Sequence, residues 1–193
     1  MELAIPGFGT LRLALAADPT FALTDPELTL DANPIAVGLH RGRAERDLPP
    51  LEHLVLDYNG TLALDGRPLP GVKTRLKRLA RLLRIHVVTA DTFGKARAGL
   101  GGVDCRLEIL QGGREDRFKA SYVRRLGPQR VACIGNGRND RLMLRAAALG
   151  IVVLQAEGAS MQAVAAADLL APSVTDALDV FLQPRRLLAS LRS

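Results

Sequence analysis

The chain has 193 residues, of which 48% are hydrophobic and 24% are charged, and its formal net charge at pH 7 is +6. This length suits one domain that buries about 70% of the surface exposed by the unfolded chain. The composition excludes an intrinsically disordered protein, and no apolar run approaches the roughly 18 residues of a membrane span. Because only 4% of the residues are aromatic, a solvated basic surface is favoured over nucleic-acid binding.

The N-terminus and the cysteines give an expectation about the cellular compartment. Residues 1–17 end in small residues like a signal peptide, but they begin without a basic segment and contain Glu2 and Pro6. A secretion signal is therefore not expected. Cys105 and Cys133 lie in strand-like runs, which is typical of reduced core residues rather than of a disulfide. These features predict a cytoplasmic protein.

Residues 14–50 are the least regular part of the chain. They contain five prolines and only short apolar stretches, which favours an insertion or a surface excursion over a part of the core. The alternative is a lid over a site or an arm that joins two copies. The flanks, residues 1–13 and residue 51 onward, would then enter the sheet together as an edge strand. We predict one domain over residues 1–193, with its core at residues 51–183.

From Leu51 onward, strand and helix patterns alternate, which predicts a Rossmann-like three-layer α/β fold with a central, mainly parallel sheet. The predicted strands are His53–Asp57, Ile85–Thr89, Cys105–Leu110, Arg130–Ile134, Ile151–Leu154 and Asp168–Leu170. The predicted helices are Val72–Leu83, Thr92–Leu100, Asp116–Leu126, Asp140–Leu149, Ser160–Ala166 and Thr175–Leu182, with a last turn at residues 187–192. Residues 62–70, which contain Asp65-Gly66 and two prolines, predict a small hairpin.

Polar residues stand where the predicted strands end. The first strand ends on Asp57, and the residues after it include Asn59, Gly60 and Thr61. The second strand ends on Thr89. Because the carboxyl ends of parallel strands meet at one edge of a sheet, these side chains are expected to lie close together. Gly60 would let the backbone turn tightly beside the carboxylate of Asp57. His86, within the second apolar strand, is expected to be a satisfied core or edge residue.

Two later segments supply further candidate residues. Lys119 is placed in the first turn of the helix that follows Gly112-Gly113. The run Val131–Ile134 breaks into Gly-Asn-Gly-Arg-Asn-Asp, which contains Asn136, Asn139 and Asp140. Taken singly, a threonine at a strand end, a helix lysine and an aspartate before a helix would suit structural roles such as capping. Their occurrence together, in this order, favours a functional site.

Taken in chain order, these four segments resemble the motifs of the haloacid-dehalogenase-like (HAD) phosphotransferases, from about residue 51 to the C-terminus. Asn59 departs from that pattern, because the family's first motif is usually Asp-x-Asp-Gly-Thr. Asn59 and the segment 136–140 together are similar to small soluble proteins related to the phosphorylation domain of P-type ATPases. Larger HAD enzymes insert a cap domain in the interval 57–89 or 89–119, and here neither interval has room for one. The resemblance therefore implies a capless site open to water, unless a second subunit or the N-terminal segment covers it.

The resemblance also implies a role for each residue. Asp57 would be the nucleophile that forms an aspartyl-phosphate. Thr89 and Lys119 would bind the phosphoryl oxygens. Mg²⁺ would be held by Asp57 and Asp140, with the backbone carbonyl of Asn59 as a further ligand. The remaining members of the implied site are Asn136, which stands where relatives carry an acidic residue near the metal, and the supporting residues Gly60, Thr61 and Asn139.

Asn59 leaves the activity open, because an amide cannot act as the general acid and base that HAD phosphatases have at this position. The leading interpretation is a slow Mg²⁺-dependent phosphohydrolase, phosphatase or ATPase-like. The alternative is a catalytically reduced module that binds phosphate or a nucleotide, linked through the family resemblance to cation transport. The expected partners are a phosphorylated small molecule, a nucleotide or a phosphoprotein. The sequence does not fix the oligomeric state, and a homo-oligomer is one of the possibilities.

Overall fold

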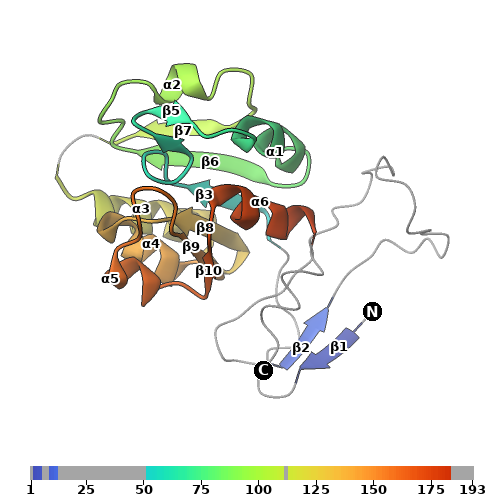
Figure 1. Ribbon diagram of the computed structural model, residues 1–193. Coiled ribbons are helices and arrows are strands. Elements are labelled where there is room, and N and C mark those ends of the chain that lie inside the picture. Colours follow the sequence, from blue (N-terminus) through green and yellow to red (C-terminus); the bar gives the residue numbers. More distant parts are fainter. Residues whose placement is uncertain (1, 6–8, 13–50, 111–112, 184–193) are drawn as a thin grey trace.

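The computed structural model describes residues 2–5, 9–12, 51–110 and 113–183. Within these residues, six parallel strands form one sheet in the order β10-β9-β8-β3-β6-β7 (Figure 1). The strands are β3 (His53–Leu56), β6 (Arg84–Thr89), β7 (Arg106–Ile109), β8 (Val131–Gly135), β9 (Leu149–Val153) and β10 (Leu169–Ala171). The inner strands β3, β8 and β9 are buried along their whole length, because helices cover both faces of the sheet.

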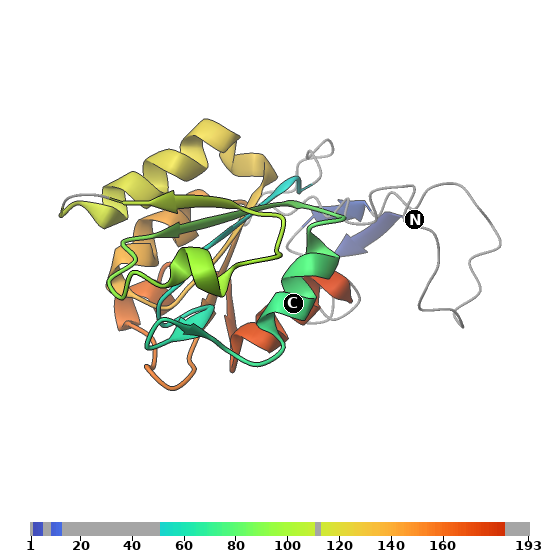
Figure 2. The same cartoon turned by 90° about the horizontal axis from the view of Figure 1, so that it is seen from above.

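The helices are divided between the two faces of the sheet. One face is covered by α1 (Val72–Leu79), α2 (Ala96–Gly99) and α6 (Val174–Leu182), whose apolar residues share one core cluster. The other face is covered by α3 (Glu115–Leu126), α4 (Arg141–Ala146) and α5 (Met161–Val164), whose apolar residues form a second cluster. Figure 2, seen from above, shows α3 and α6 on opposite sides of the sheet. The three-layer Rossmann-like prediction is confirmed.

Short elements complete the described part of the chain. The strands β4 (Ala63–Leu64) and β5 (Arg67–Pro68) form the predicted hairpin. Two 3-10 turns, Pro128–Arg130 and Arg138–Asp140, come before β8 and α4. Between residues 57 and 89 the chain forms this hairpin and α1, and between residues 89 and 119 it forms α2, β7 and the start of α3. The described residues therefore contain no cap domain, as predicted.

The helix predicted to begin at Thr92 begins at Ala96, after a turn and a bend at residues 92–94. Two predicted helix ends and one predicted strand are also wrong. The helix predicted to reach Leu83 ends at Leu79, and turns follow before β6. The helix predicted to reach Leu149 ends at Ala146, because Ala147 takes an extended conformation and Leu149 opens the buried strand β9. In both cases an apolar run continues through the loop that leads into a core strand, so the hydrophobic pattern does not mark the helix end.

The N-terminal strands do not join the large sheet. β1 (Glu2–Ile5) and β2 (Gly9–Arg12) pair with each other in antiparallel register, so the edge strand predicted for this region is not found. The insertion predicted at residues 14–50 and the turn predicted at residues 187–192 lie outside the described residues. In the part of the chain that is described, no helix has the length and apolar character to cross a membrane.

Candidate active site

The candidate site lies at the carboxyl edge of the sheet, where β3 has β6 on one side and β8 on the other. Asp57 follows β3 directly, and its backbone N–H donates to the carbonyl of Ile134 in β8. Thr89 ends β6 and Asn136 follows β8. The chain leaves β3 toward β6 and returns to β8 on the other side, which makes this edge the topological switch point of the sheet.

A buried lysine joins the two aspartates of the site. Lys119 Nζ lies 2.6 Å from Asp57 Oδ1 and 2.7 Å from Asp140 Oδ1, and the lysine and Asp140 are completely buried. Lys119 lies in the second turn of α3 rather than in the first as expected. The three groups carry a summed charge of −1 when ionised, which leaves the site with an excess of negative charge.

The environment shifts the pKa values of both partners upward. Burial, together with repulsion from Asp140, raises the pKa of Asp57 to about 7, although Lys119 acts in the opposite direction. For Lys119, burial alone would lower the pKa, but the attraction of Asp140 and Asp57 outweighs it and the pKa is raised. The ammonium is therefore charged at neutral pH, whereas Asp57 is poised to exchange a proton in that range.

Asp140 is held in place by the backbone of its own turn. Its Oδ2 accepts hydrogen bonds from the backbone N–H groups of Asn136 (3.0 Å) and Gly137 (2.9 Å). A Cβ at Gly135 would lie 2.6 Å from this carboxylate, which explains why the turn begins with glycine. Asp140 therefore presents its other oxygen, Oδ1, to Lys119.

The loop after Asp57 is packed against the turn that contains Asn136. Gly60 has φ +75°, and a Cβ there would lie 2.6 Å from Glu157 Oε2 and 2.7 Å from Asn136 Nδ2. The Thr61 hydroxyl donates to Asn136 Oδ1 at 3.2 Å, and Asn136 Nδ2 donates to the carbonyl of Gly158 at 3.1 Å. Both amide atoms of Asn136 are thus engaged, which fixes the orientation of the side chain.

Three further residues from the sequence analysis have identifiable surroundings. The Thr89 hydroxyl, almost fully buried, accepts a hydrogen bond from the backbone N–H of Asp91 at 3.0 Å. Asn139 Nδ2 donates to Glu115 Oε2 at 2.7 Å and so ties the turn before α4 to the start of α3. Asn59 Oδ1 is buried and has no hydrogen-bond partner among the described residues. A buried acceptor without a partner is costly unless a ligand or solvent satisfies it.

The sequence analysis did not identify Gln155, which connects the loop after Asp57 to α6. Gln155 Nε2 donates to the carbonyls of Gly60 (2.8 Å) and Thr61 (2.7 Å), and Gln155 Oε1 accepts from the backbone N–H of Val174 (3.0 Å). Its backbone has φ +49°, which is uncommon for a residue other than glycine. A polar residue directly after the predicted strand Ile151–Leu154 was the only signal for it in the sequence.

We expect Gln155→Ala to lower the free energy of unfolding by about 1–3 kcal/mol, because three backbone groups lose their partner. Denaturant unfolding measures this change. Gln162→Ala, an exposed glutamine in α5, is the matched control and should stay within about 0.5 kcal/mol of the wild type. Equal stability of the two variants would show that the connection contributes nothing.

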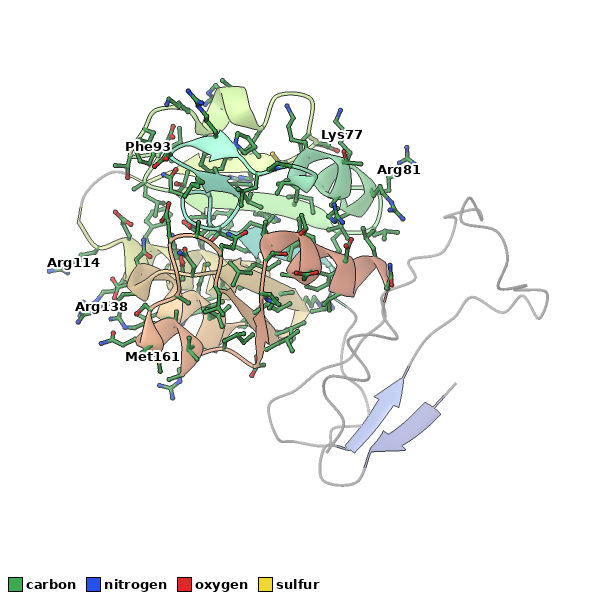
Figure 3. The ribbon with its side chains drawn as sticks, viewed as in Figure 1. Lys77, Arg81, Phe93, Arg114, Arg138 and Met161 are labelled. Carbon is green, nitrogen blue, oxygen red and sulfur yellow. The ribbon has the colours of Figure 1, made fainter. Side chains whose placement is uncertain are left out.

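A cavity of about 260 Å³ borders the same loop. Gly60, Gln155 and Glu157 line one side, and residues of the β4–β5 hairpin and the start of α6 line the rest. Arg114 and Arg138, at the starts of α3 and of the turn before α4, project into solvent on one side of the molecule (Figure 3). Asp57, Asp140 and Lys119 are not among the residues that line this cavity, so it adjoins the loop after Asp57 rather than the aspartates themselves.

The donor set fits a hard divalent cation such as Mg²⁺. Asp57 and Asp140 converge on one ammonium group, and the buried Asn59 Oδ1 has no hydrogen-bond partner among the described residues. Mg²⁺ in proteins commonly takes one or two carboxylates and completes its shell with water and substrate oxygens. The described residues contain no cluster of three or more His, Cys, Asp or Glu side chains that would suit a metal bound by protein groups alone.

Comparison with known proteins identifies two curated relatives of the chain, while no family model matches it. The uncharacterized protein MJ0073 of Methanocaldococcus jannaschii is 41% identical over 64 residues, which are 33% of this chain and 69% of that protein. The uncharacterized protein MJ0072 of the same organism is 46% identical over 39 residues, which are 20% of this chain and 89% of that protein.

Among solved structures, the fold is similar to HAD superfamily phosphatases. The putative 3-deoxy-D-manno-octulosonate 8-phosphate phosphatase of Vibrio cholerae has a TM-score of 0.59 at 16% identity, over 70% of this chain and 86% of that one. The 3-deoxy-D-manno-octulosonate 8-phosphate phosphatase of Moraxella catarrhalis was solved with magnesium, phosphate and KDO. It has a TM-score of 0.54 at 15% identity, over 74% of this chain and 94% of that one. A putative HAD hydrolase of Legionella pneumophila has a TM-score of 0.55 at 17% identity, over 72% of this chain and 86% of that one. The fold is HAD-like, as the sequence motifs implied.

Proposed function

The chain belongs to the same family as the uncharacterized protein MJ0073 and has an HAD-like fold, and we propose that it is a Mg²⁺-dependent phosphohydrolase that acts through an aspartyl-phosphate at Asp57. The observation that carries this proposal is the buried cluster of Lys119 with Asp57 and Asp140. A nucleophile, a cation for the phosphoryl oxygens and a second carboxylate are the groups that this chemistry requires.

In the proposed reaction, a carboxylate oxygen of Asp57 attacks phosphorus and the bond from phosphorus to the leaving-group oxygen breaks. Lys119 and the Thr89 hydroxyl stabilise the charge on the phosphoryl oxygens. Water then attacks the aspartyl-phosphate, the bond to Asp57 breaks, and inorganic phosphate leaves. When bound by Asp57 and Asp140, Mg²⁺ would neutralise phosphoryl charge and orient the substrate.

Asn59 determines the expected rate. Its carboxamide can neither protonate the leaving group nor deprotonate the attacking water, so both protons are exchanged with solvent. General acid–base catalysis is worth about 10²–10⁴-fold, and we expect turnover to be slower by a factor of this order than with a carboxylate. A substrate with a good leaving group, such as an aryl phosphate or a nucleotide anhydride, should therefore be preferred. This last feature agrees with the resemblance to the P-type ATPase phosphorylation domain.

The proposal is tested by steady-state assays with an aryl phosphate and with ATP, each with and without Mg²⁺. We expect Mg²⁺-dependent release of phosphate and a phosphoprotein that is stable in acid. If phosphate binds but neither substrate is hydrolysed, the alternative function of a phosphate- or nucleotide-binding module would be supported. Beryllium fluoride, a phosphoryl mimic, should bind at Asp57 when Mg²⁺ is present.

The proposed metal site makes a prediction about Asn136. Asn136→Asp adds a carboxylate near Asp57 and Asp140, and we expect it to tighten Mg²⁺ binding in titration calorimetry. Without metal, the variant should unfold more easily by about 1–3 kcal/mol, because the Gly158 carbonyl loses its donor. Asn136→Ala is the control, because it also removes the hydrogen bond to the Gly158 carbonyl but adds no charge. Equal or weaker Mg²⁺ affinity would place Asn136 outside the metal's surroundings.

The raised pKa of Asp57 makes Mg²⁺ binding depend on pH. Because the folded protein holds a proton on this carboxyl below a pH of about 7, Mg²⁺ must displace that proton in order to bind. We expect the apparent affinity to rise by up to about tenfold per pH unit below pH 7 and to level off above it. Calorimetry in buffers of different ionisation enthalpy measures the released proton. Asp57→Asn should release none, and a flat profile in the wild type would contradict the assignment.

A further inference from the structure

A second cavity lies at the other edge of the sheet, away from the candidate active site. It has a volume of about 640 Å³ and is lined by the starts of β3, β6 and β7 and by the turn after α1. His53 and Asp57 lie at opposite ends of the β3 segment, about 13 Å apart along the strand. The cavity is therefore separate from the aspartates and Lys119.

Two buried histidines and a tyrosine form a hydrogen-bonded chain beside this cavity. His53 Nδ1 lies 3.0 Å from His86 Nε2, and His86 Nδ1 lies 2.9 Å from the hydroxyl of Tyr122. The two histidines are each 6% exposed and both line the cavity. His86 is thus a satisfied residue, as expected from the sequence, but its partners are two further polar groups instead of the backbone.

The hydrogen-bonded row of His53, His86 and Tyr122 allows one arrangement of protons that leaves a donor unused. If the Tyr122 hydroxyl donates to His86 and His86 donates to His53, then His53 Nε2 carries a hydrogen. The closest carboxylate oxygen to this nitrogen, Glu52 Oε2, is 3.9 Å away, which is too far for a hydrogen bond. In this arrangement, His53 Nε2 is available to donate to an acceptor in the cavity.

Arginine side chains surround the same cavity. Arg81, Arg84 and Arg106 line it, and Arg81 projects from the turn after α1 (Figure 3). Arg106 is paired with Glu108 at 2.7 Å, and Arg130 nearby is paired with Glu52. Arg81 and Arg84 have no ion-pair partner among the described residues, so their charges are available to a ligand. Asp104 is the remaining acidic residue of the lining.

The same charges act on the histidines. Burial lowers the pKa of His86 to about 4, with further contributions from His53, Arg106 and Arg84 that Glu108 opposes. Burial and Arg84 also lower the pKa of His53, and Glu52 opposes them. Both rings are therefore neutral at pH 7, and a bound anion would make a positive charge on them easier to hold.

We propose that this cavity binds a small molecule through an oxyanion group, a carboxylate or a phosphate, held by Arg81 and Arg84 and by a hydrogen bond from His53 Nε2. Guanidinium groups bind both kinds of oxyanion with paired, charge-assisted hydrogen bonds. The site would take its ligand independently of the proposed phosphohydrolase reaction, because it shares no residue with the candidate active site.

The test is NMR of protein labelled with ¹⁵N in histidine, free of Mg²⁺, titrated with inorganic phosphate and separately with acetate. The chain has three histidines, so the ring signals of His53 and His86 are readily assigned by mutation. We expect their ring nitrogens to shift to saturation with at least one of the two anions. The anion that binds more tightly identifies the kind of oxyanion.

Matched variants separate a built site from general attraction to a basic protein. Arg84→Ala, an exposed side chain, should weaken binding by at least about tenfold, the value of a charge-assisted hydrogen bond. Arg97→Ala removes the same charge from α2 and should leave binding unchanged. The proposal is overturned if neither anion gives a saturable shift, or if the two arginine variants weaken binding equally. Asp57→Asn should retain binding, which separates this result from any failure of the proposed reaction.

Discussion

Asp57→Asn should abolish the acid-stable phosphoprotein and lower Mg²⁺-dependent turnover by at least about 10³-fold, the order of loss seen when a nucleophile is removed. The substitution keeps the size of the side chain but removes the attacking oxygen. It also removes one of the two carboxylates proposed to hold the metal. Lys119 would keep its contact with Asp140, 2.7 Å away, so the fold should survive.

The measurement is phosphate release and labelling by a radioactive phosphodonor, with the wild type and the variant at equal concentration. Asp65→Asn is the control, because Asp65 is exposed on the β4–β5 hairpin and its φ of +51° is one that asparagine tolerates. It should retain full activity. A phosphoprotein or unchanged turnover in Asp57→Asn would exclude Asp57 as the acceptor.

Asn59→Asp should raise phosphatase turnover by at least about tenfold, a conservative value within the 10²–10⁴-fold typical of general acid–base catalysis. The structure supports this expectation, because Asn59 Oδ1 is buried and has no hydrogen-bond partner among the described residues. The exchange therefore sacrifices no bond to that oxygen. Partial burial and the neighbouring carboxylates would raise the pKa of the new acid, and a raised pKa suits a proton donor near neutral pH.

The opposing effect is repulsion among the carboxylates, which would increase the demand for Mg²⁺ or shift the pH optimum. The comparison is therefore made at saturating Mg²⁺ across a pH series. Asn59→Ala, which removes the amide without adding an acid, should show no increase, and Asp57→Asn combined with Asn59→Asp should be inactive. If Asn59→Asp gives no increase at any pH while Mg²⁺ still binds, the binding-module function would be favoured.

The order of the chemical groups along the chain could be predicted from the sequence, because each follows a short apolar run. Asp57 after β3, Thr89 at the end of β6 and Asn136 after β8 needed only the rule that parallel strands present their carboxyl ends at one edge. Lys119 is harder to place from the sequence, since a lysine in an amphipathic helix is usually solvated. Its complete burial between two aspartates depends on how α3 packs against the sheet.

The three-layer fold, the capless intervals and the residue types of the candidate site follow from the local hydrophobic period and from the order of the motifs, so they can be predicted from the sequence. Which side chains meet across long intervals is seen only in the folded structure. Gln155 reaches back 94 residues to the carbonyl of Thr61, and His53 pairs with His86 across two strands. The raised pKa of Asp57 likewise results from burial and from neighbours that the fold brings together. Contacts of this kind depend on strand order and on burial, and neither can be predicted from the residues next to the contact in the sequence.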